Sequence, residues 1–329
     1  MKKKTILVNN LLPEKGLEEL YAHFNVIAPK EKKFTKEEII EHIPECHGLL
    51  SSFLIVDKGI IDAGKSLEII SNFGAGYNNV DVNYATERGI MVTNIPDTVT
   101  YSTAELTLGL MISLLRRVVE GDRLLRAKDR QAWGGPTHFM GQNLAGKTLG
   151  IIGMGRIGLA VARLAQGFGM NIVYQKRTPY PPEIEMQLNI KYMPLGELVQ
   201  KADVISLHCP LTPETHHLIN REILKAMKST AYLINTARGP VVEENALLEA
   251  LKGGEIRGAA LDVFEFEPKI SEELLTLSNV VLTPHIGSST LETRTDMTKA
   301  CVKHLIDYFS GQTPTHVVNP SFSKNRNQA

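Results

Sequence analysis

The sequence predicts an α/β protein with parallel sheets covered by helices on both faces. Its 329 residues exceed what one hydrophobic core usually supports, so two domains are expected. Short apolar, β-branched runs alternate with stretches of helical spacing along the chain, which is typical of parallel sheets. The apolar fraction of 43% and the charged fraction of 22% are those of ordinary globular proteins.

The first hundred residues contain five predicted strands. They lie at 5–8, 25–28, 48–53, 67–73 and 90–95, with helices predicted at 14–23 and 36–43. A long helix is predicted over 102–128 and leads into a second unit. The loop-rich stretch 129–147 follows, in which Trp133 is expected to pack within the segment or to reach a neighbouring subunit.

A second alternating series begins at residue 148. Its six predicted strands lie at 148–153, 171–175, 203–208, 231–235, 258–263 and 280–283. Six strands with helices between them fit a doubly wound dinucleotide-binding fold. A last helix at 291–309 has Met297, Cys301 and Leu305 at helical spacing and is expected to fold back onto the first domain.

Charge and composition exclude several classes of protein. Lys plus Arg and Asp plus Glu each number 36, so no net field recruits nucleic acid or an anionic membrane. The apolar run Ile6–Val8 is too short for a signal peptide, and no run approaches the roughly 18 apolar residues of a membrane span. Three separated cysteines without clustered histidines predict no metal site. A cytoplasmic protein is expected.

The segment LGIIGMGRIGL contains a G-x-G-x-x-G motif between a predicted strand and a predicted helix. Gly153 would allow the tight turn, Gly155 the approach of a diphosphate, and Gly158 close packing of helix on strand. Arg156 adds positive charge inside the loop. A dinucleotide is therefore expected here, and the alternative is a glycine turn without a ligand.

The residues after the next strand bear on which dinucleotide binds. An NAD enzyme usually carries an acidic residue there, for the ribose 2′-hydroxyl. This chain has Gln175, Lys176 and Arg177 instead, which would attract a 2′-phosphate. The sequence favours NADP(H), with NAD(H) still possible. The alternative is that these cations are solvated loop residues.

Three strand ends in the second half offer groups for chemistry. Ligands of open α/β sheets bind beyond the carboxyl ends of strands, where the sequence places Arg238, Glu267 and His285. Reduction of a keto acid needs a cation for the substrate and a proton donor to the carbonyl oxygen. Arg238 and His285 would supply these, and a nearby carboxylate would favour the protonated imidazole. Glu267 is preferred for that role over Glu265, which could be a surface residue.

Each of these residues has a simpler interpretation. Arg238 could close a loop through a surface ion pair, and His285 could be a structural histidine. His216 and His217 are read as solvated residues without a role. The coincidence of three such groups at strand ends favours the functional interpretation.

The chain resembles the D-isomer-specific 2-hydroxyacid dehydrogenases over nearly its whole length. The stretches that carry the resemblance are FGAGYNNVD, GIIGMGRIG, INTARGPVVEENAL, GAALDVFEFEP and TPHIGSST. Within the family it is most similar to glyoxylate, hydroxypyruvate and 2-ketogluconate reductases. The resemblance implies a Rossmann cofactor domain at 102–288 and a smaller flavodoxin-like α/β substrate domain from 1–101 and 289–329. It also implies a homodimer through the cofactor domain.

The resemblance also implies roles for individual residues. Arg238 would bind and polarise the substrate, Glu267 would partner the imidazole, and His285 would be the general acid and base. Further substrate contacts are expected from Ser52, Phe53, Ala75, Gly76 and Ser288. The expected cofactor contacts are Thr103, Gly153, Gly155, Arg156, Ile157, Gly158, Gln175, Lys176, Arg177, Cys209, Thr236, Ala237, Arg238, Asp262, His285 and Gly287.

Other functions remain open from the sequence. The chain could be a phosphoglycerate, phosphite or formate dehydrogenase of the same family, although formate enzymes typically carry Gln at the position of Glu267. A dinucleotide-sensing corepressor on the same fold is the alternative from a different class. A small-molecule 2-keto or 2-hydroxy acid is the expected partner, with no nucleic acid and no membrane.

Overall fold

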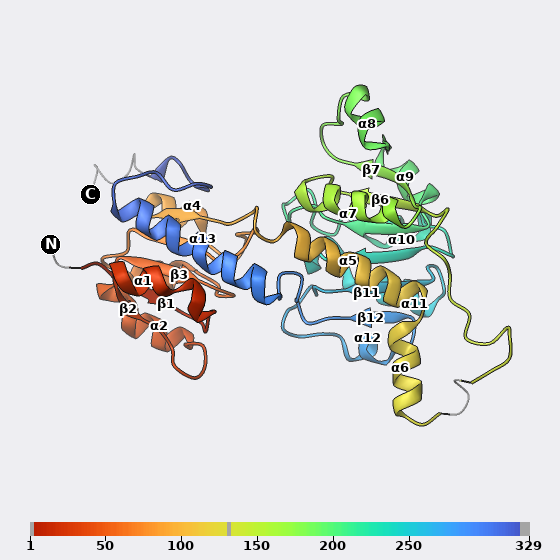
Figure 1. Cartoon of the computed structure of the whole chain (residues 1–329), viewed down its shortest axis with the longest axis horizontal. Coiled ribbons are helices and arrows are strands. Elements are labelled where there is room, and N and C mark those ends of the chain that lie inside the picture. Colours follow the sequence, from red (N-terminus) through yellow and green to blue (C-terminus); the bar gives the residue numbers. More distant parts are fainter. Residues whose placement is uncertain (1–2, 130–132, 323–329) are drawn as a thin grey trace. The chain divides into compact units, whose positions relative to one another are not determined.

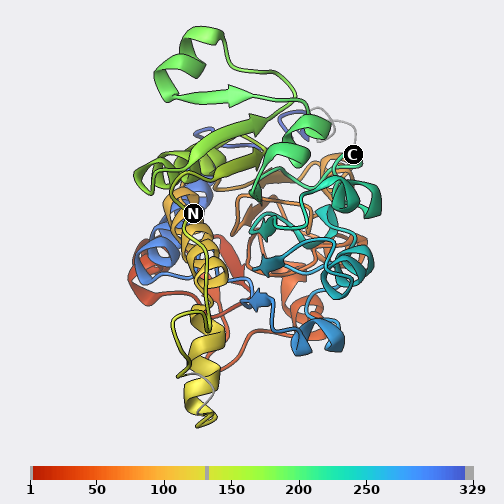
Figure 2. The ribbon, with the colours of Figure 1, turned by 90° about the vertical axis from the view of Figure 1, so that its right-hand side faces the viewer.

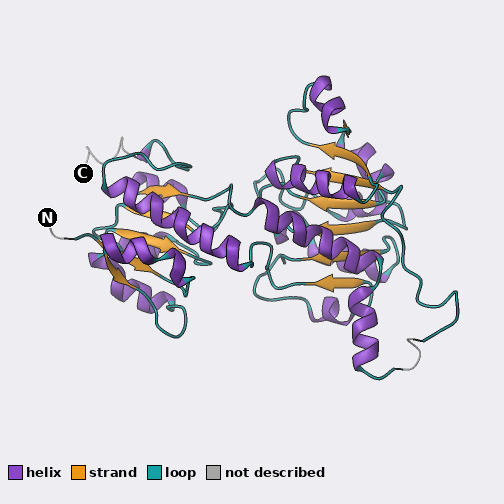
Figure 3. Ribbon diagram, viewed as in Figure 1, coloured by secondary structure: helices purple, strands orange, loops and turns teal. Residues whose placement is uncertain are grey.

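The computed structural model describes residues 3–129 and 133–322 and divides the chain into two compact units. Unit 1 comprises Met1–Val99 and Ser288–Ala329, and unit 2 comprises Thr100–Gly287. Both have a parallel sheet with helices on its faces (Figures 1 and 3), which confirms the predicted α/β class. In the described part of the chain, no helix has the length and apolar character needed to cross a membrane.

Unit 1 is built on a five-stranded parallel sheet of order β2-β1-β3-β4-β5. This order is that of flavodoxin-like folds. The strands are β1 Thr5–Val8, β2 Asn25–Ile27, β3 Gly48–Ser51, β4 Ile69–Asn72 and β5 Met91–Thr93. The helices are α1 Glu18–His23, α2 Lys36–His42, α3 Lys58–Ala63, α4 Val82–Glu87 and α13 Leu291–Phe309, with 3₁₀ turns at Glu14–Gly16 and Ile43–Glu45.

Helix α13 returns the C-terminal segment to unit 1, as predicted. Thr290 caps its first turn by accepting the Thr293 amide at 3.1 Å. Met297, Cys301 and Leu305 are buried at helical spacing. The Ser71 hydroxyl on β4 donates to the carbonyl of Cys301 at 3.2 Å, so the helix is also tied to the sheet by a buried hydrogen bond.

Unit 2 is built on a seven-stranded parallel sheet of order β12-β11-β10-β9-β6-β7-β8. The strands are β6 Thr148–Ile152, β7 Asn171–Gln175, β8 Ile190–Tyr192, β9 Val204–Leu207, β10 Tyr232–Asn235, β11 Gly258–Leu261 and β12 Val280–Leu282. The helices are α5 Thr100–Leu115, α6 Val118–Arg126, α7 Arg156–Gly167, α8 Pro182–Leu188, α9 Leu195–Lys201, α10 Arg221–Ala226, α11 Glu244–Lys252 and α12 Glu272–Thr276, with a 3₁₀ turn at Gly239–Val241.

Successive strand residues of unit 2 enter two different cores. Val173 of β7 belongs to the buried cluster that also contains residues of α9, α10 and α11, whereas Ile172 and Tyr174 belong to the cluster that contains residues of α5 and α7. Side chains alternate between the faces of a strand, so a sheet covered on both faces has apolar residues in continuous runs. This explains why the strands could be recognised from such runs.

Two predictions for unit 2 were wrong. The helix expected over 102–128 breaks at Arg117, which has a left-handed φ of 55°. There the Leu115 carbonyl accepts the Gln142 amide at 2.8 Å, and Arg117 turns back to pair with Glu120. The prediction also missed β8, an edge strand of three residues that lies beside β7 (Figure 2). Trp133, for which packing within the segment and reaching a neighbouring subunit were both considered, is 80% exposed.

Candidate active site

Three neighbouring strands of unit 2 bring Arg238, Glu267 and His285 to the same edge of the sheet. Arg238 lies beyond β10, Glu267 beyond β11 and His285 beyond β12, and these strands are adjacent in the order β12-β11-β10. Because all are parallel, their carboxyl ends meet at one edge. The three residues were predicted because ligands bind beyond the carboxyl ends of parallel strands, and the same arrangement explains why they lie close together.

Glu267 and His285 form a hydrogen-bonded pair. The imidazole Nδ1 lies 2.9 Å from Oε2 of Glu267, while Oε1 accepts the Phe264 amide at 2.9 Å. Nδ1 must carry a proton to donate to the carboxylate, which directs Nε2 away from it. Burial alone would raise the pKa of Glu267, but hydrogen bonds from His285 and Phe264 and the charges of His285 and Arg238 lower it overall.

Arg238 is held by the turn that follows β10. The side chain of Asn235 donates to the Arg238 carbonyl and accepts the Ala237 amide, both at 3.0 Å. The guanidinium Nη1 donates to the Ala237 carbonyl at 2.7 Å. Burial lowers the pKa of Arg238, and the charge of Glu267 opposes this effect. The side chain stays a cation, because arginine does not lose its proton in proteins.

Asp262 organises the loop that carries His285. Its carboxylate accepts the hydroxyl of Thr283 at 2.6 Å and the amides of Ile286 and Gly287 at 2.8 Å each. Its carbonyl accepts the His285 amide at 2.8 Å. His285 adopts a left-handed φ of 53°, a conformation that non-glycine residues hold only when their surroundings impose it. Asp262 supplies those surroundings.

The glycine motif lies where a dinucleotide-binding turn requires it, between β6 and α7. Gly153 has a φ of 96°, and a Cβ there would lie 2.4 Å from the Cys209 amide nitrogen. A Cβ at Gly158 would lie 2.5 Å from the Gly153 carbonyl, whereas one at Gly155 would meet open space. Arg156 and Ile157 begin α7. The open space at Gly155 and the N-terminus of α7 suit a diphosphate.

Other predicted cofactor residues lie along the same sheet edge. Gln175 ends β7 and its carbonyl accepts the Gly153 amide at 2.9 Å, and Lys176 and Arg177 follow it. Burial raises the pKa of the Cys209 thiol to about 11, so the residue is an unreactive neighbour of the glycine turn.

The threonines assigned to the cofactor site connect α5 with two loops of unit 2. Thr103 donates to the Gly287 carbonyl at 3.3 Å. Thr236 hydrogen-bonds Thr107 at 2.9 Å, and Thr107 is a buried residue that the sequence did not single out. These bonds tie the loops after β10 and β12 to α5.

The predicted substrate residues Ser52, Phe53, Ala75, Gly76 and Ser288 belong to unit 1. Asn94 and Asn72 donate to the carbonyls of Ala75 and Gly76 at 2.6 and 2.9 Å. Within the described residues, neither amide N–H of Ala75 and Gly76 has an acceptor, so both can bind an anion.

Phe53 has a contact that the sequence did not reveal. Its φ of 50° is left-handed, and the guanidinium of Arg294 lies 5.1 Å from its ring and 5.6 Å from that of Phe73. Arg294 lies in the first turn of α13, far from both rings in sequence. It fixes the ends of β3 and β4 relative to each other.

Glu265, for which a surface position was considered, is largely buried, and His217 is partly solvated at 34% exposed but has a partner. His217 Nε2 lies 2.6 Å from Oε1 of Glu265, and Oε2 of Glu265 accepts the Glu244 amide at 2.9 Å. Glu265 is only 11% exposed. The two acids of the FEFEP stretch are thus separated: Glu265 ties two loops together, and Glu267 contacts the candidate catalytic imidazole.

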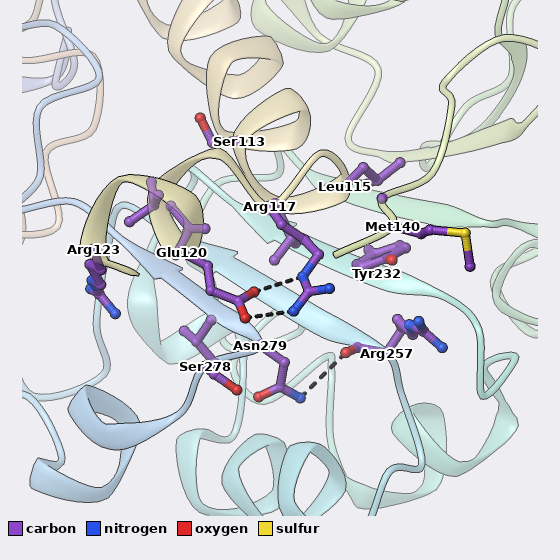
Figure 4. A pocket seen from close by; sticks show the side chains of 15 residues that line it. Ser113, Leu115, Arg117, Glu120, Arg123, Met140, Tyr232, Arg257, Ser278 and Asn279 are labelled. Carbon is purple, nitrogen blue, oxygen red and sulfur yellow. Dashed lines mark hydrogen bonds and ion pairs between the residues drawn. The ribbon is translucent and has the colours of Figure 1, made fainter. Parts of the chain in front are cut away.

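A pocket elsewhere in unit 2 is separate from this site. Figure 4 shows it at the amino ends of β10–β12, where Arg117 pairs with Glu120 and the side chain of Asn279 donates to the Arg257 carbonyl at 3.3 Å. The candidate catalytic groups follow the opposite ends of these strands. No group of His, Cys, Asp and Glu among the described residues is arranged to hold a metal ion.

The fold and the site define an α/β oxidoreductase with a dinucleotide-binding domain, and known proteins specify the family. Residues 108–287 match the family model of the D-isomer specific 2-hydroxyacid dehydrogenase, NAD binding domain. A protein of Staphylococcus aureus (strain MRSA252), assigned by name to the 2-hydroxyacid dehydrogenases, is 46% identical over 316 residues, which are 95% of this chain and 99% of that protein. The chain belongs to the D-isomer-specific 2-hydroxyacid dehydrogenase family.

Solved structures agree with this assignment. A crystal structure of a Thermus thermophilus protein matches with a TM-score of 0.89 and 42% identity, covering 95% of this chain and 99% of that one. The NADPH-dependent glyoxylate/hydroxypyruvate reductase of Sinorhizobium meliloti, solved with NADP and malonate, matches with a TM-score of 0.85 and 34% identity, covering 98% of each chain.

Proposed function

We propose that this enzyme reduces a small 2-keto acid, namely glyoxylate, hydroxypyruvate or 2-ketogluconate, to the D-2-hydroxy acid. The observation that carries the proposal is the His285–Glu267 pair at 2.9 Å, which joins the loops after β12 and β11, next to the β10 strand that leads to Arg238. Bound NADPH would supply the hydride for the carbonyl carbon. The S. meliloti protein, by its name, is a reductase of this kind.

The protein side chains would handle charge and the proton. Arg238 binds the substrate carboxylate and polarises its carbonyl, where negative charge develops during reduction. His285 donates the proton on Nε2 to that oxygen, while Glu267 holds the ring through Nδ1 and stabilises the imidazolium. In the reverse direction His285 accepts the proton. Ser52, Phe53, Ala75, Gly76 and Ser288 are proposed as further substrate contacts.

A preference for NADPH over NADH is part of the proposal. It is supported by Lys176 and Arg177 after β7, where a carboxylate would repel a 2′-phosphate. We also propose a cytoplasmic homodimer that associates through unit 2, supported by the family resemblance and by Trp133, which is 80% exposed. Light scattering of the purified protein tests the dimer.

A steady-state panel tests the reaction. Glyoxylate, hydroxypyruvate, 2-ketogluconate, pyruvate and phosphohydroxypyruvate are assayed with each cofactor by nicotinamide absorbance. Glyoxylate or hydroxypyruvate with NADPH should give the highest kcat/KM. A lead for phosphohydroxypyruvate would favour a phosphoglycerate-type enzyme, and binding of cofactor without turnover would favour a corepressor. H285A should lower kcat by about a hundredfold, and near-full activity would remove His285 from the mechanism.

A further inference from the structure

Tyr180, between β7 and α8, links the basic segment after β7 to the glycine turn. Its hydroxyl donates to the Met154 carbonyl at 3.1 Å, and Met154 lies between Gly153 and Gly155. The face of its ring lies 3.8 Å from Nζ of Lys176. One side chain therefore contacts both segments that the proposed function assigns to the anionic groups of the cofactor.

Tyr180 is itself held in place by hydrogen bonds that lead to β7 and α8. Its amide donates to the hydroxyl of Tyr174 at 2.8 Å, and that hydroxyl donates to Glu185 of α8 at 2.6 Å. Burial and the bond to Glu185 raise the pKa of Tyr174 to about 12, so its hydroxyl keeps its proton. Tyr174 is fully buried in β7. The ring beneath Lys176 thus has a rigid support.

The contact with the Tyr180 ring restrains the ammonium group of Lys176 without neutralising its charge. Among the described residues, no carboxylate lies within ion-pair distance of Lys176. A ring face attracts an ammonium through its quadrupole and leaves the ammonium protons on the far side able to bind an anion. A lysine otherwise has many conformers, and ordering it costs entropy when the anion binds. Tyr180 restrains this side chain before binding.

We propose that Tyr180 is a positioning residue for the cofactor 2′-phosphate: it holds Lys176 at a fixed place relative to the glycine turn and thereby sets NADPH selectivity. The inference rests on the proposed function, which places that phosphate at Lys176. Lys176 contacts the ligand, and Tyr180 acts through Lys176 and through Met154. A purely structural role would affect all nucleotides equally.

Calorimetric binding of two probes to the full chain separates these roles. Adenosine 2′,5′-bisphosphate carries the 2′-phosphate, and adenosine 5′-monophosphate lacks it. Y180L should weaken binding of the bisphosphate about fivefold and change binding of the monophosphate less than twofold. Y180F keeps the ring and loses the bond to Met154, so about a twofold loss is expected for the bisphosphate. Y192L is the matched control, since Tyr192 also packs on Tyr174, at 5.7 Å between ring centroids.

The coupling to Lys176 is tested by a double-mutant cycle. In the K176Q background, Y180L should cause no further loss of bisphosphate binding, because the charge that Tyr180 positions is gone. Equal weakening of both probes by Y180L, additive losses in the cycle, or the same loss in Y192L would overturn the inference. If Y180L does not fold, Y180F decides, and unchanged selectivity in Y180F would overturn the link to the glycine turn.

The outcome separates the inference from the proposed function. If the wild-type protein binds both probes equally, the proposed NADPH preference is wrong, and the inference that depends on it is wrong too. If the wild type prefers the bisphosphate and Y180L keeps that preference, only the role of Tyr180 is wrong. Thermal melting of each variant confirms that the folded protein is being compared.

Discussion

The carboxylate of Asp262 accepts the backbone amide of Gly287 at 2.8 Å, although the two residues are 25 positions apart. The same carboxylate accepts the Thr283 hydroxyl and the Ile286 amide. Asp262 is 1% exposed, and burial raises its pKa. The loop that carries His285 is therefore held by a buried carboxylate, and the hydrogen bonds to it offset the free-energy cost of its burial.

D262N should loosen this loop. Asparagine keeps one oxygen but replaces the other with an NH₂ group, so at least one backbone amide of the loop loses its acceptor. The free energy of unfolding should fall by about 1–3 kcal/mol, the cost of an unsatisfied buried group, and kcat should fall at least tenfold because His285 loses its position. Urea unfolding and steady-state kinetics measure the two effects. Wild-type kcat in D262N would show that the loop does not depend on Asp262.

E267Q should change how stability depends on pH. The folded state lowers the pKa of Glu267 relative to the unfolded value of about 4.3. Ionised Glu267 therefore contributes stability above that value, and the contribution is lost as the pH falls through the folded pKa. The advantage of the wild type over E267Q in urea unfolding should be greatest near pH 7 and shrink toward pH 3. An advantage that stays constant over this range would contradict the prediction, and E272Q, at an exposed position on α12, is the control.

R238K should separate charge from geometry at the proposed substrate cation. Lysine keeps the charge but cannot form two parallel hydrogen bonds to a carboxylate. We expect kcat/KM for the keto acid to fall by roughly a hundredfold, equivalent to about 2.7 kcal/mol, and cofactor affinity to fall much less, although Arg238 is also expected among the cofactor contacts. R257K is the control, because Arg257 lines the pocket at the amino ends of the strands. A loss of cofactor affinity equal to the loss of kcat/KM would show that Arg238 acts on the cofactor instead.

The sequence was sufficient for the fold class because strands buried on both faces are continuous apolar runs, as Ile172, Val173 and Tyr174 show. It was also sufficient to predict that Arg238, Glu267 and His285 lie close together, because the carboxyl ends of adjacent parallel strands share an edge. Their roles in the reaction stay predictions.

The features that the sequence did not reveal depend on distant partners. The break at Arg117 is stabilised by Gln142, and Glu265 contacts His217, 48 residues away. Strand β8 is three residues long and has Lys191 at its centre, so it lacks an apolar run. A local sequence pattern does not predict contacts between residues that are distant in the sequence. The groups that share one edge of a parallel sheet can be predicted, because they follow from the order of the strands.

The variant G239A tests whether the candidate site requires the close approach of the loop of Arg238 to the loop of Glu267. A Cβ on Gly239 would lie 1.8 Å from the Phe264 carbonyl oxygen and 2.5 Å from the Glu265 amide nitrogen, and backbone atoms cannot move aside independently. G239A should therefore push the loop of Arg238 away from the loop of Glu267, lower the free energy of unfolding by about 1–3 kcal/mol and reduce kcat. G196A is the matched control, because a Cβ on this exposed glycine of α9 would contact nothing within 4 Å and alanine favours a helix by about 0.5–1 kcal/mol. The melting temperature should fall in G239A and rise in G196A, and only G239A should lose activity. Equal melting temperatures of the two variants would mean that the two loops separate without a cost in stability.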